Sequence, residues 1–133
     1  MIFNKLIPEL TVIDIVKTKH FYIDILGFSI EYEREADKFI FVSLDGSQFM
    51  FEEIHEDDWN VAAMEYPFGR GINFSIEVND IDAIYEKLIH ENYPLYRQMM
   101  VNEYEVDGNC LEQKEFLVQD PDGYLLRFTK KGD

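Results

Sequence analysis

The fold is decided by residues 8–28, which read PELTVIDIVKTKHFYIDILGF. The run 7–13 is β-branched and half-alternating, which predicts a strand. Asp14 follows it as the N-cap of a helix. From Thr18 onward the apolar residues fall at helical spacing, and Gly27 ends that pattern. The stretch therefore predicts a strand, a capped helix and a glycine stop.

Three short strands are expected next, at residues 29–32, 39–44 and 49–54. Asp45-Gly46 joins the last two, because an Asp-Gly pair supplies the two left-handed residues of a tight hairpin turn. Residues 55–70 sustain neither a helical nor a strand period, so they are expected to form a loop. The first half of the chain thus predicts the element order β-α-β-β-β.

The second half of the chain repeats this order. Residues 72–78 predict a strand, and Asp80 lies 66 positions after Asp14 as a second N-cap. A second helical stripe runs from there towards Asn92. Three further strand-like runs follow, at residues 95–100, 114–119 and 124–129.

The turns repeat as well as the elements. Asp122-Gly123, within the DPDG turn 120–123, lies 77 positions after Asp45-Gly46, and the extra residues are assigned to a loop over 101–113. Since caps, turns and element order agree, the chain is interpreted as α+β with two β-α-β-β-β modules. They are expected to form one domain over residues 1–133, with module one at 5–54, a linker at 55–70 and module two at 71–130.

Composition narrows the class of protein. With 133 residues of which 47% are hydrophobic, the chain has room for one core and enough apolar surface to fold. Its 27 acidic residues against 12 basic ones give a formal net charge of −15, which repels phosphate backbones and anionic lipids. We therefore expect neither nucleic acid nor a membrane as a partner.

The expected location follows from cysteine usage and hydropathy. The single cysteine, Cys110, excludes an intrachain disulfide framework and a cysteine-rich zinc site. The opening residues carry Lys5 and Pro8 and hold no long apolar run, and nowhere do 18 apolar residues follow one another. We expect no secretion signal, no membrane span and a cytoplasmic protein.

Two stretches resemble the vicinal oxygen chelate superfamily: residues 8–28 and the closing FLVQDPDGYLLRF at 116–128. This superfamily includes glyoxalase I, extradiol dioxygenases, fosfomycin resistance enzymes and bleomycin resistance proteins. The ending, together with GRGINF at 69–74, is most similar to the bleomycin resistance group. The resemblance implies half-open curved sheets that form a ligand cup, and a homodimer in which modules are joined or exchanged.

Metal-using members of this superfamily place four ligands on inward-facing strand positions. The resemblance puts those positions at Ile7, Met50, Asn73 and Arg127. An aliphatic side chain, a thioether, an amide and a cation cannot hold a hard or borderline divalent metal. We therefore expect no metal and no other cofactor.

Other donors give no better ligand set. A register two residues along would bring in Glu9 and Glu52, but the other module would then offer only Ser75 and Thr129. The histidines, which are interpreted as helix-face or solvated side chains, are His20, His55 and His90.

The expected cup combines inward strand positions, aromatic residues of neighbouring strands and two rim loops. The predicted ligand-binding residues are Glu9, Phe39, Phe41, Met50, Glu52, Trp59, Asn73, Ser75, Tyr104, Phe116 and Arg127. Strand alternation leaves open which phase of the strands that carry Phe39 and Phe41, and Phe49 and Phe51, faces the cup, and core packing stays the alternative for each ring. Carboxylates beside aromatic faces suit a planar cation, at ~1 kcal/mol per contact.

These observations predict a metal-free binding protein without turnover, which sequesters a cationic aromatic small molecule as the bleomycin resistance group does. The alternative is a metal-dependent glyoxalase, another lyase or a dioxygenase of the same superfamily. A third possibility is a small-molecule sensor or a partner protein without resistance activity. Metal content and turnover distinguish the alternative from the first hypothesis, and bleomycin binding distinguishes the third.

Overall fold

In the computed structural model, which describes residues 1–132, the chain forms two four-stranded sheets. The first comprises β1 (Glu9–Val12), β2 (Ser29–Arg34), β3 (Phe39–Leu44) and β4 (Ser47–Glu53), in the order β1-β4-β3-β2. The second comprises β5 (Asn73–Glu77), β6 (Arg97–Val106), β7 (Asn109–Gln119) and β8 (Leu125–Lys131), in the order β5-β8-β7-β6. The predicted α+β class and the repeated β-α-β-β-β order are confirmed.

The two halves also share their strand register. β1 and β4 pair in parallel with Glu9 opposite Met50, and β5 and β8 pair in parallel with Ser75 opposite Arg127. Ser75 and Arg127 lie 66 and 77 positions after Glu9 and Met50, which are the offsets already found for the helix caps and the hairpin turns. The internal repeat therefore extends from local signals to strand pairing.

Each helix begins at the predicted aspartate cap. Helix α1 (Ile15–Lys19) continues into a π-helical turn (His20–Ile25), and the Asp14 carboxylate accepts hydrogen bonds from the amides of Val16 and Lys17. Helix α2 (Ile81–His90) begins after Asp80, whose Oδ1 accepts from the Ala83 amide at 3.1 Å. These contacts satisfy amides that would otherwise lack partners at the helix start.

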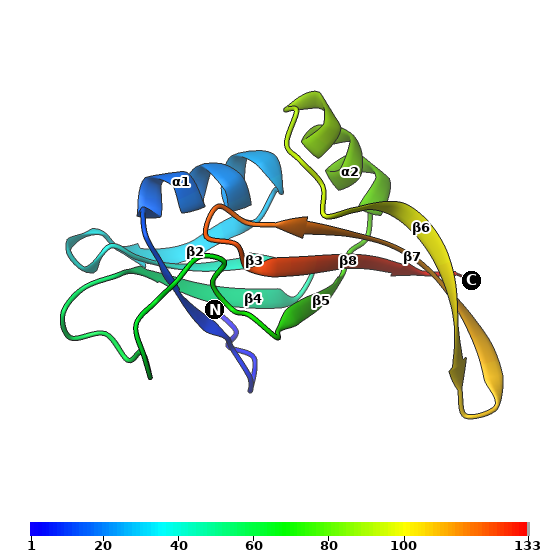
Figure 1. The fold of residues 1–133 in the computed structure, drawn as a ribbon, viewed down its shortest axis with the longest axis horizontal. Coiled ribbons are helices and arrows are strands. Elements are labelled where there is room, and N and C mark those ends of the chain that lie inside the picture. The colour runs from blue at the N-terminus through cyan, green and yellow to red at the C-terminus, as the bar shows by residue number, and fades with distance from the viewer. Residues whose placement is uncertain (133) are drawn as a thin grey trace.

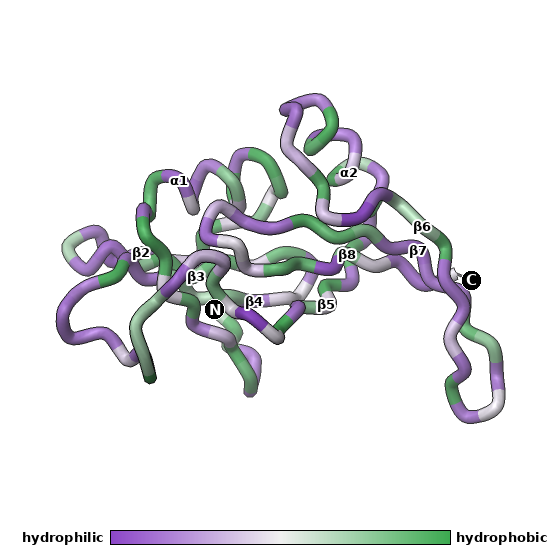
Figure 2. Tube along the Cα trace, in the orientation of Figure 1, coloured by the Kyte–Doolittle hydropathy of each residue, from purple (hydrophilic) through white to green (hydrophobic). Residues whose placement is uncertain are grey.

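Both helices lie on the same side of the two sheets, and the core fills the space between them (Figure 1). The central strands carry much of the hydrophobic sequence, whereas the turns at the β2 end of the molecule are largely hydrophilic (Figure 2). Phe116 belongs to this core: it is fully buried and its ring stacks on Phe128 at 5.3 Å. Its predicted place in the cup is therefore wrong, because alternation along β7 turns it towards the helices.

The predicted loop over residues 101–113 is also wrong. β6 and β7 continue through it as a long hairpin that projects away from the helices (Figure 1), closed by Asp107-Gly108 with φ of 52° and 80°. An Asp-Gly turn signal of the same kind as Asp45-Gly46 is present there. Tyr104 and Cys110 consequently lie on strands and not in a loop.

The closing turn 120–123 links the second module to the first. The Tyr22 hydroxyl donates to Asp120 at 2.8 Å, and the Ile13 amide donates to Asp122 at 3.0 Å. The Tyr124 hydroxyl donates to the Thr11 carbonyl at 2.9 Å. These bonds hold the strand ends of both sheets together.

The segment 55–70 contains neither helix nor strand, as its sequence predicts. Within residues 1–132, no helix is both long and apolar enough to cross a membrane.

Candidate functional site

Each sheet has an open face, which we define as the face turned away from its helix. On the first sheet, the side chains that point to the core include Leu10 of β1, Phe51 of β4 and Ile40 of β3. Because side chains alternate along a strand, their neighbours in sequence point to the open face. On the first sheet these neighbours are Glu9, Thr11, Phe39, Phe41, Met50 and Glu52. Phe39 and Phe41 therefore face the predicted cup, whereas Phe49 and Phe51 lie in the core.

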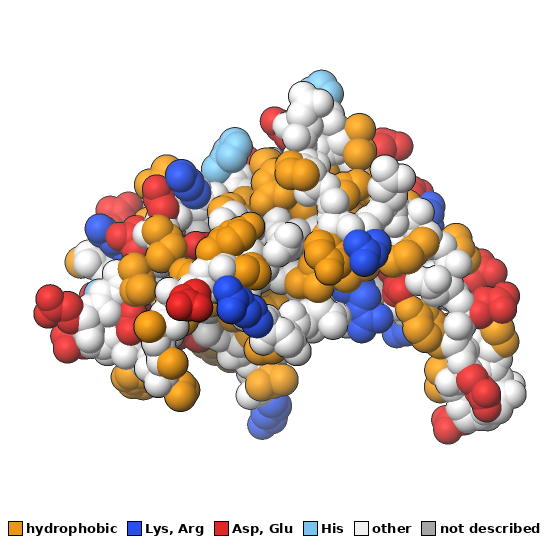
Figure 3. Space-filling view, viewed as in Figure 1, with side chains coloured by type: hydrophobic (Ala, Val, Ile, Leu, Met, Phe, Trp, Pro, Cys, Tyr) orange, Lys and Arg blue, Asp and Glu red, His pale blue; other side chains and the backbone are white. Residues whose placement is uncertain are grey.

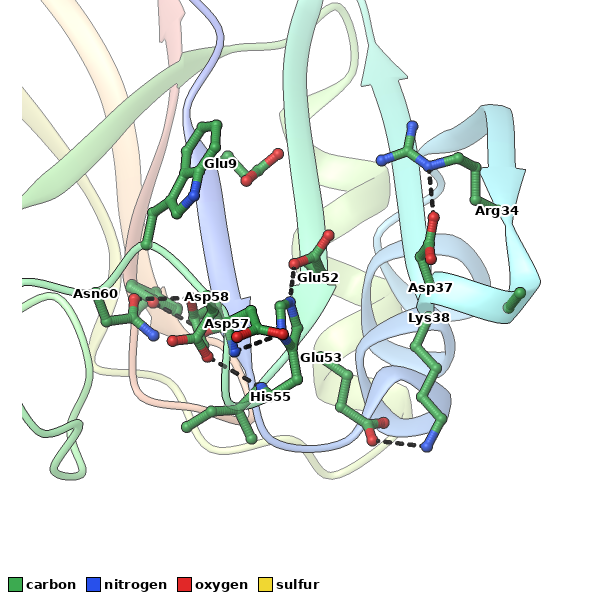
Figure 4. Close-up of a pocket in the computed structure, with 15 residues that line it drawn as sticks. Glu9, Arg34, Asp37, Lys38, Glu52, Glu53, His55, Asp57, Asp58 and Asn60 are labelled. Carbon is green, nitrogen blue, oxygen red and sulfur yellow. Dashed lines mark hydrogen bonds and ion pairs between the residues drawn. The ribbon is translucent and has the colours of Figure 1, made fainter.

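A hollow of about 810 Å³ lies against the open face of the first sheet. Its walls come from β1, the end of β4, the β2–β3 turn and the acidic loop that starts at His55 (Figure 4). Three predicted ligand-binding residues, Glu9, Glu52 and Trp59, line it together. The Trp59 side chain is almost fully exposed, so it stands free at the rim.

The carboxylates make this hollow a negative site. Burial raises the pKa of Glu9, the charge of Glu52 raises it further, and the charge of Arg34 lowers it. Mutual repulsion of the Glu9 and Glu52 carboxylates means that a cation placed between them would stabilise both ionised forms. Asp57 and Asp58 add charge from the loop. Figure 3 shows acidic side chains gathered at this end of the molecule as well as along the β6–β7 hairpin.

His55 is a site residue that sequence reasoning missed. Its Nε2 lies 2.5 Å from Glu52 Oε1, and the Asp57 amide donates to its Nδ1 at 3.1 Å. Because Nδ1 is already an acceptor, the neutral ring carries its proton on Nε2 and donates it to Glu52. The hydrogen bond to Glu52 raises the pKa of His55. The available signal was the three-residue spacing of Glu52 and His55 at the end of a strand.

The end of β2 and the β2–β3 turn supply the basic wall of the hollow, through Arg34 and Lys38, and sequence reasoning missed both residues. Arg34 Nε donates to Asp37 at 3.0 Å, and Lys38 Nζ lies 3.0 Å from Glu53 Oε1. The Arg34 guanidinium lies over the Phe39 ring, with Cζ 3.9 Å from the ring centroid. Arg34 and Phe39 are opposite each other in the β2–β3 pairing, and this register could not be read from the sequence alone.

The other predicted site residues lie on the second sheet. Asn73, Ser75, Tyr104 and Arg127 occupy its open face, and none of them lines the 810 Å³ hollow. The predicted inward set is therefore divided between two faces within one chain. Met50, Phe39 and Phe41 share the open face of the first sheet with Glu9 but do not line the hollow.

A buried carboxylate organises the open face of the second sheet. Glu115 is 2% exposed and accepts hydrogen bonds from Asn102, Tyr104 and Gln113. Burial alone would raise the pKa of Glu115, but these donors together with Arg127 lower it. The carboxylate is thus charged and fully partnered, which fixes the side chains around it.

The residues at the four metal-ligand positions do not fit a divalent metal. Arg127 Nε donates to Asn73 Oδ1 at 3.2 Å, so the one amide oxygen of the set already accepts from a cation. Ile7 and Met50 offer no hard donor. Over residues 1–132, no group of three or more His, Cys, Asp and Glu side chains is arranged to hold a metal ion.

A family model described as "Glyoxalase superfamily protein" matches residues 1–133. A glyoxalase/bleomycin resistance protein/dioxygenase superfamily member from Vibrio splendidus 12B01 is 35% identical, covering 92% of this chain and 94% of that one, with a TM-score of 0.44. No curated protein matches the chain.

Two more distant structures share the fold. A glyoxalase/bleomycin resistance protein/dioxygenase from Alicyclobacillus acidocaldarius is 22% identical, with coverage of 98% and 92% and a TM-score of 0.66. TioX from Micromonospora sp. ML1 is 15% identical, with coverage of 96% and 98% and a TM-score of 0.74. At these identities the likeness concerns the architecture alone.

Proposed function

The chain belongs to the glyoxalase superfamily, and from that premise we propose that it is a binding protein of the bleomycin resistance type. It sequesters a cationic aromatic small molecule and does not turn it over. The observation that carries this proposal is the hollow of about 810 Å³ in which Glu9, Glu52 and Trp59 meet. Its volume falls within the range of small-molecule sites.

The chemistry of the walls favours a cation. Two carboxylates, those of Glu9 and Glu52, lie on neighbouring strands of the wall formed by the first sheet, so an organic cation relieves their repulsion and gains charge-assisted hydrogen bonds. The exposed indole of Trp59 offers a flat surface on which an aromatic part of the ligand can stack. Bleomycin-type glycopeptides combine these two features.

The donor set supports binding over metal-dependent catalysis. Metal-assisted chemistry requires several converging oxygen, nitrogen or sulfur donors, and the four relevant positions provide only the Asn73 amide, which is bonded to Arg127. Stoichiometric nickel, zinc, iron or manganese in the purified protein, together with glyoxalase or dioxygenase turnover, would replace this proposal by the metal-dependent alternative.

The direct test is a titration with metal-free bleomycin, followed by the fluorescence of Trp59, the single tryptophan. Glu9→Gln and Glu52→Gln should each weaken binding by about 1 to 3 kcal/mol, because each removes a charged acceptor from the hollow. Glu77→Gln is the matched control, since Glu77 lies on the open face of the second sheet and pairs with Lys131. Unchanged affinity in both hollow variants would contradict the carboxylate model.

We also propose that two chains associate. Within residues 1–132, the part of the β6–β7 hairpin between Gln113 and its turn pairs with no third strand, since β8 meets β7 only from Gln113 onward. A two-stranded ribbon is marginally stable by itself, and Tyr104 and Val106 on it are 37% and 48% exposed. A second copy of the chain that covers this ribbon would bury them.

The proposed setting is the cytoplasm, with a small molecule as the ligand. A lone cysteine, Cys110, supports a reducing compartment. The net charge of −15 supports a cationic ligand and disfavours nucleic acid and anionic lipid surfaces.

A further inference from the structure

Two aromatic rings on the open face of the first sheet are hidden although they lie outside the core. Phe39 is 2% exposed and Phe41 is 0% exposed, yet neither belongs to the cluster that packs beneath the helices. Rings on an open face are buried only if something covers them. The covers that lie over the ring faces are the chain's own Arg34 on Phe39 and Phe3 on Phe41. The Tyr32 ring borders both, with centroids 5.7 Å from Phe39 and 5.6 Å from Phe41.

Arg34 covers Phe39 through a cation–π contact. Its Cζ lies 3.9 Å from the ring centroid, its Nε donates to Asp37, and its charge lowers the pKa of Glu9. Figure 4 shows the Arg34 side chain at the end of β2, with its guanidinium turned towards the side on which Glu52 and Glu9 lie. The Arg34 guanidinium therefore lies over the Phe39 ring and on the same hollow as the carboxylates of Glu9 and Glu52.

Phe3 covers Phe41 by stacking its ring on the Phe41 ring. The two rings stack with centroids 5.1 Å apart and an interplanar angle of 10°. The segment that carries Phe3 is held by Asn4, whose backbone and side-chain nitrogens donate to Gln48 and to the Gly46 carbonyl, each at 2.8 Å. Phe3 itself is 51% exposed, and its only other aromatic neighbour within residues 1–132 is Tyr32, in an edge contact with centroids 6.5 Å apart.

Both covers are weakly held. The side chains of Arg34 and Asp37 are 49% and 59% exposed, and neither an exposed ion pair nor an exposed cation–π contact contributes much free energy. Displacing Arg34 would expose the face of the Phe39 ring that the guanidinium covers, and it would remove the charge that lowers the pKa of Glu9. A ligand that offers the same groups can therefore replace the covers at a small penalty.

We infer that Phe39 and Phe41 form a two-ring seat for the ligand, which Arg34 and Phe3 occupy in the free protein and which the ligand takes by displacing them. The inference rests on the proposed function and names the charged group of the same ligand. Because Arg34 fills the seat with a planar guanidinium, the ligand carries a planar guanidinium or amidinium group beside an aromatic ring. A compact ammonium lacks the flat face that stacks on Phe39.

The test measures binding of benzamidine, an aromatic amidinium, by calorimetric titration, with neutral benzamide as the uncharged probe. Arg34→Gln should bind benzamidine about three- to thirtyfold more tightly than the unaltered protein, as expected when the ligand no longer competes with a weakly held cation. Lys38→Gln is the matched control, because it removes a positive charge from the same wall without uncovering Phe39. Its gain measures the general effect of charge and should be the smaller one.

Phe3 provides a second and independent arm. Phe3→Ala should tighten benzamidine binding, whereas Leu6→Ala, at an 83% exposed position of the same segment, should leave it unchanged. In the unaltered protein, the NMR signal of the Arg34 Nε–H should shift when benzamidine is added and stay in place with benzamide.

The outcomes separate the inference from the proposed function. If the protein binds bleomycin but Arg34→Gln gains no more than Lys38→Gln, or loses affinity, the seat is not occupied by Arg34 and only this inference falls. If no variant binds bleomycin or benzamidine while all keep the circular dichroism of the folded protein, the proposed function falls as well.

Discussion

Asp120 is a carboxyl group held inside the protein, at 2% exposure. Burial raises its pKa to about 7, the Tyr22 hydroxyl opposes this by donating to it, and the charge of Asp122 adds to it. The folded state therefore holds the Asp120 proton at pH values where the unfolded chain, with a pKa near 3.8, has released it. By linkage, this group makes the free energy of unfolding fall as the pH rises from about 4 to about 7.

Asp120→Asn should remove this dependence, because an amide does not ionise and its oxygen can still accept from the backbone amides of Asp122 and Tyr124. Between pH 4 and pH 8 the unaltered protein should lose about 1 to 4 kcal/mol of unfolding free energy more than the variant does. Urea unfolding at the two pH values measures the difference. The control is Asp107→Asn, at an exposed left-handed turn position that asparagine tolerates. Parallel pH profiles for Asp120→Asn and the unaltered protein would contradict the assignment.

At the scale of single residues, the sequence indicated the carboxylates of the candidate site but not their hydrogen-bond and ion-pair partners. Glu9 and Glu52 were found because they occupy alternate positions on two strands. His55 was not found, since its bond to Glu52 depends on how the acidic loop turns back after β4. Arg34 was not found because its place over Phe39 depends on the pairing of β2 with β3.

At the scale of elements, the hairpin turn at Gly46 and the closing turn at Gly123 have similar backbone angles but differ in how closely other residues pack against them. Gly46 and Gly123 have φ of 90° and 95°, which an alanine adopts only with strain. A Cβ at Gly46 would meet nothing within 4 Å, whereas one at Gly123 would lie 2.5 Å from Pro67 Cβ and 2.7 Å from its Cα. The closing turn is therefore packed tightly against Pro67 in the segment 55–70.

Gly46→Ala should lower the free energy of unfolding by about 1 to 2 kcal/mol, the strain of one left-handed residue. Gly123→Ala should lower it by at least about 1 kcal/mol more, because the clash with Pro67 adds overpacking to the same strain. Chemical unfolding of the two variants side by side measures both values. Equal losses of unfolding free energy in the two variants would show that Pro67 moves aside without cost and would contradict the prediction.

The elements themselves were largely predictable. They depend on local signals, each of which is found in the structure: the strand periods, the caps Asp14 and Asp80, and the turn at Asp45-Gly46. The segment 101–113 forms a hairpin and not the expected loop, and the local signal for it is the Asp-Gly turn at residues 107–108. Phe116 was misplaced for a different reason, since alternation gives two faces but does not say which of them the helices cover.

At the scale of the whole molecule, the exposed β6–β7 ribbon leads to a prediction about assembly. Sedimentation should give a species of twice 15.8 kDa. Val106→Glu should shift it towards the monomer, because a charge would be buried where the second copy covers the ribbon. Val16→Glu, at a 72% exposed position on α1, is the control and should leave the assembly unchanged. A monomeric unaltered protein at micromolar concentration would overturn the prediction.

The sequence by itself determined the order of elements, the duplication with its two offsets, the superfamily and the acidic character of the site. These depend on periodicity, turn chemistry and composition, which act between neighbours along the chain or over the chain as a sum. Only the tertiary structure decided which face of each sheet stays open, that Glu9 and Glu52 share a hollow apart from Asn73 and Arg127, and that Arg34 and Phe3 lie over two aromatic rings. Those relations join residues through strand register and through the packing of one sheet beside the other, and such contacts form only when the whole chain has folded.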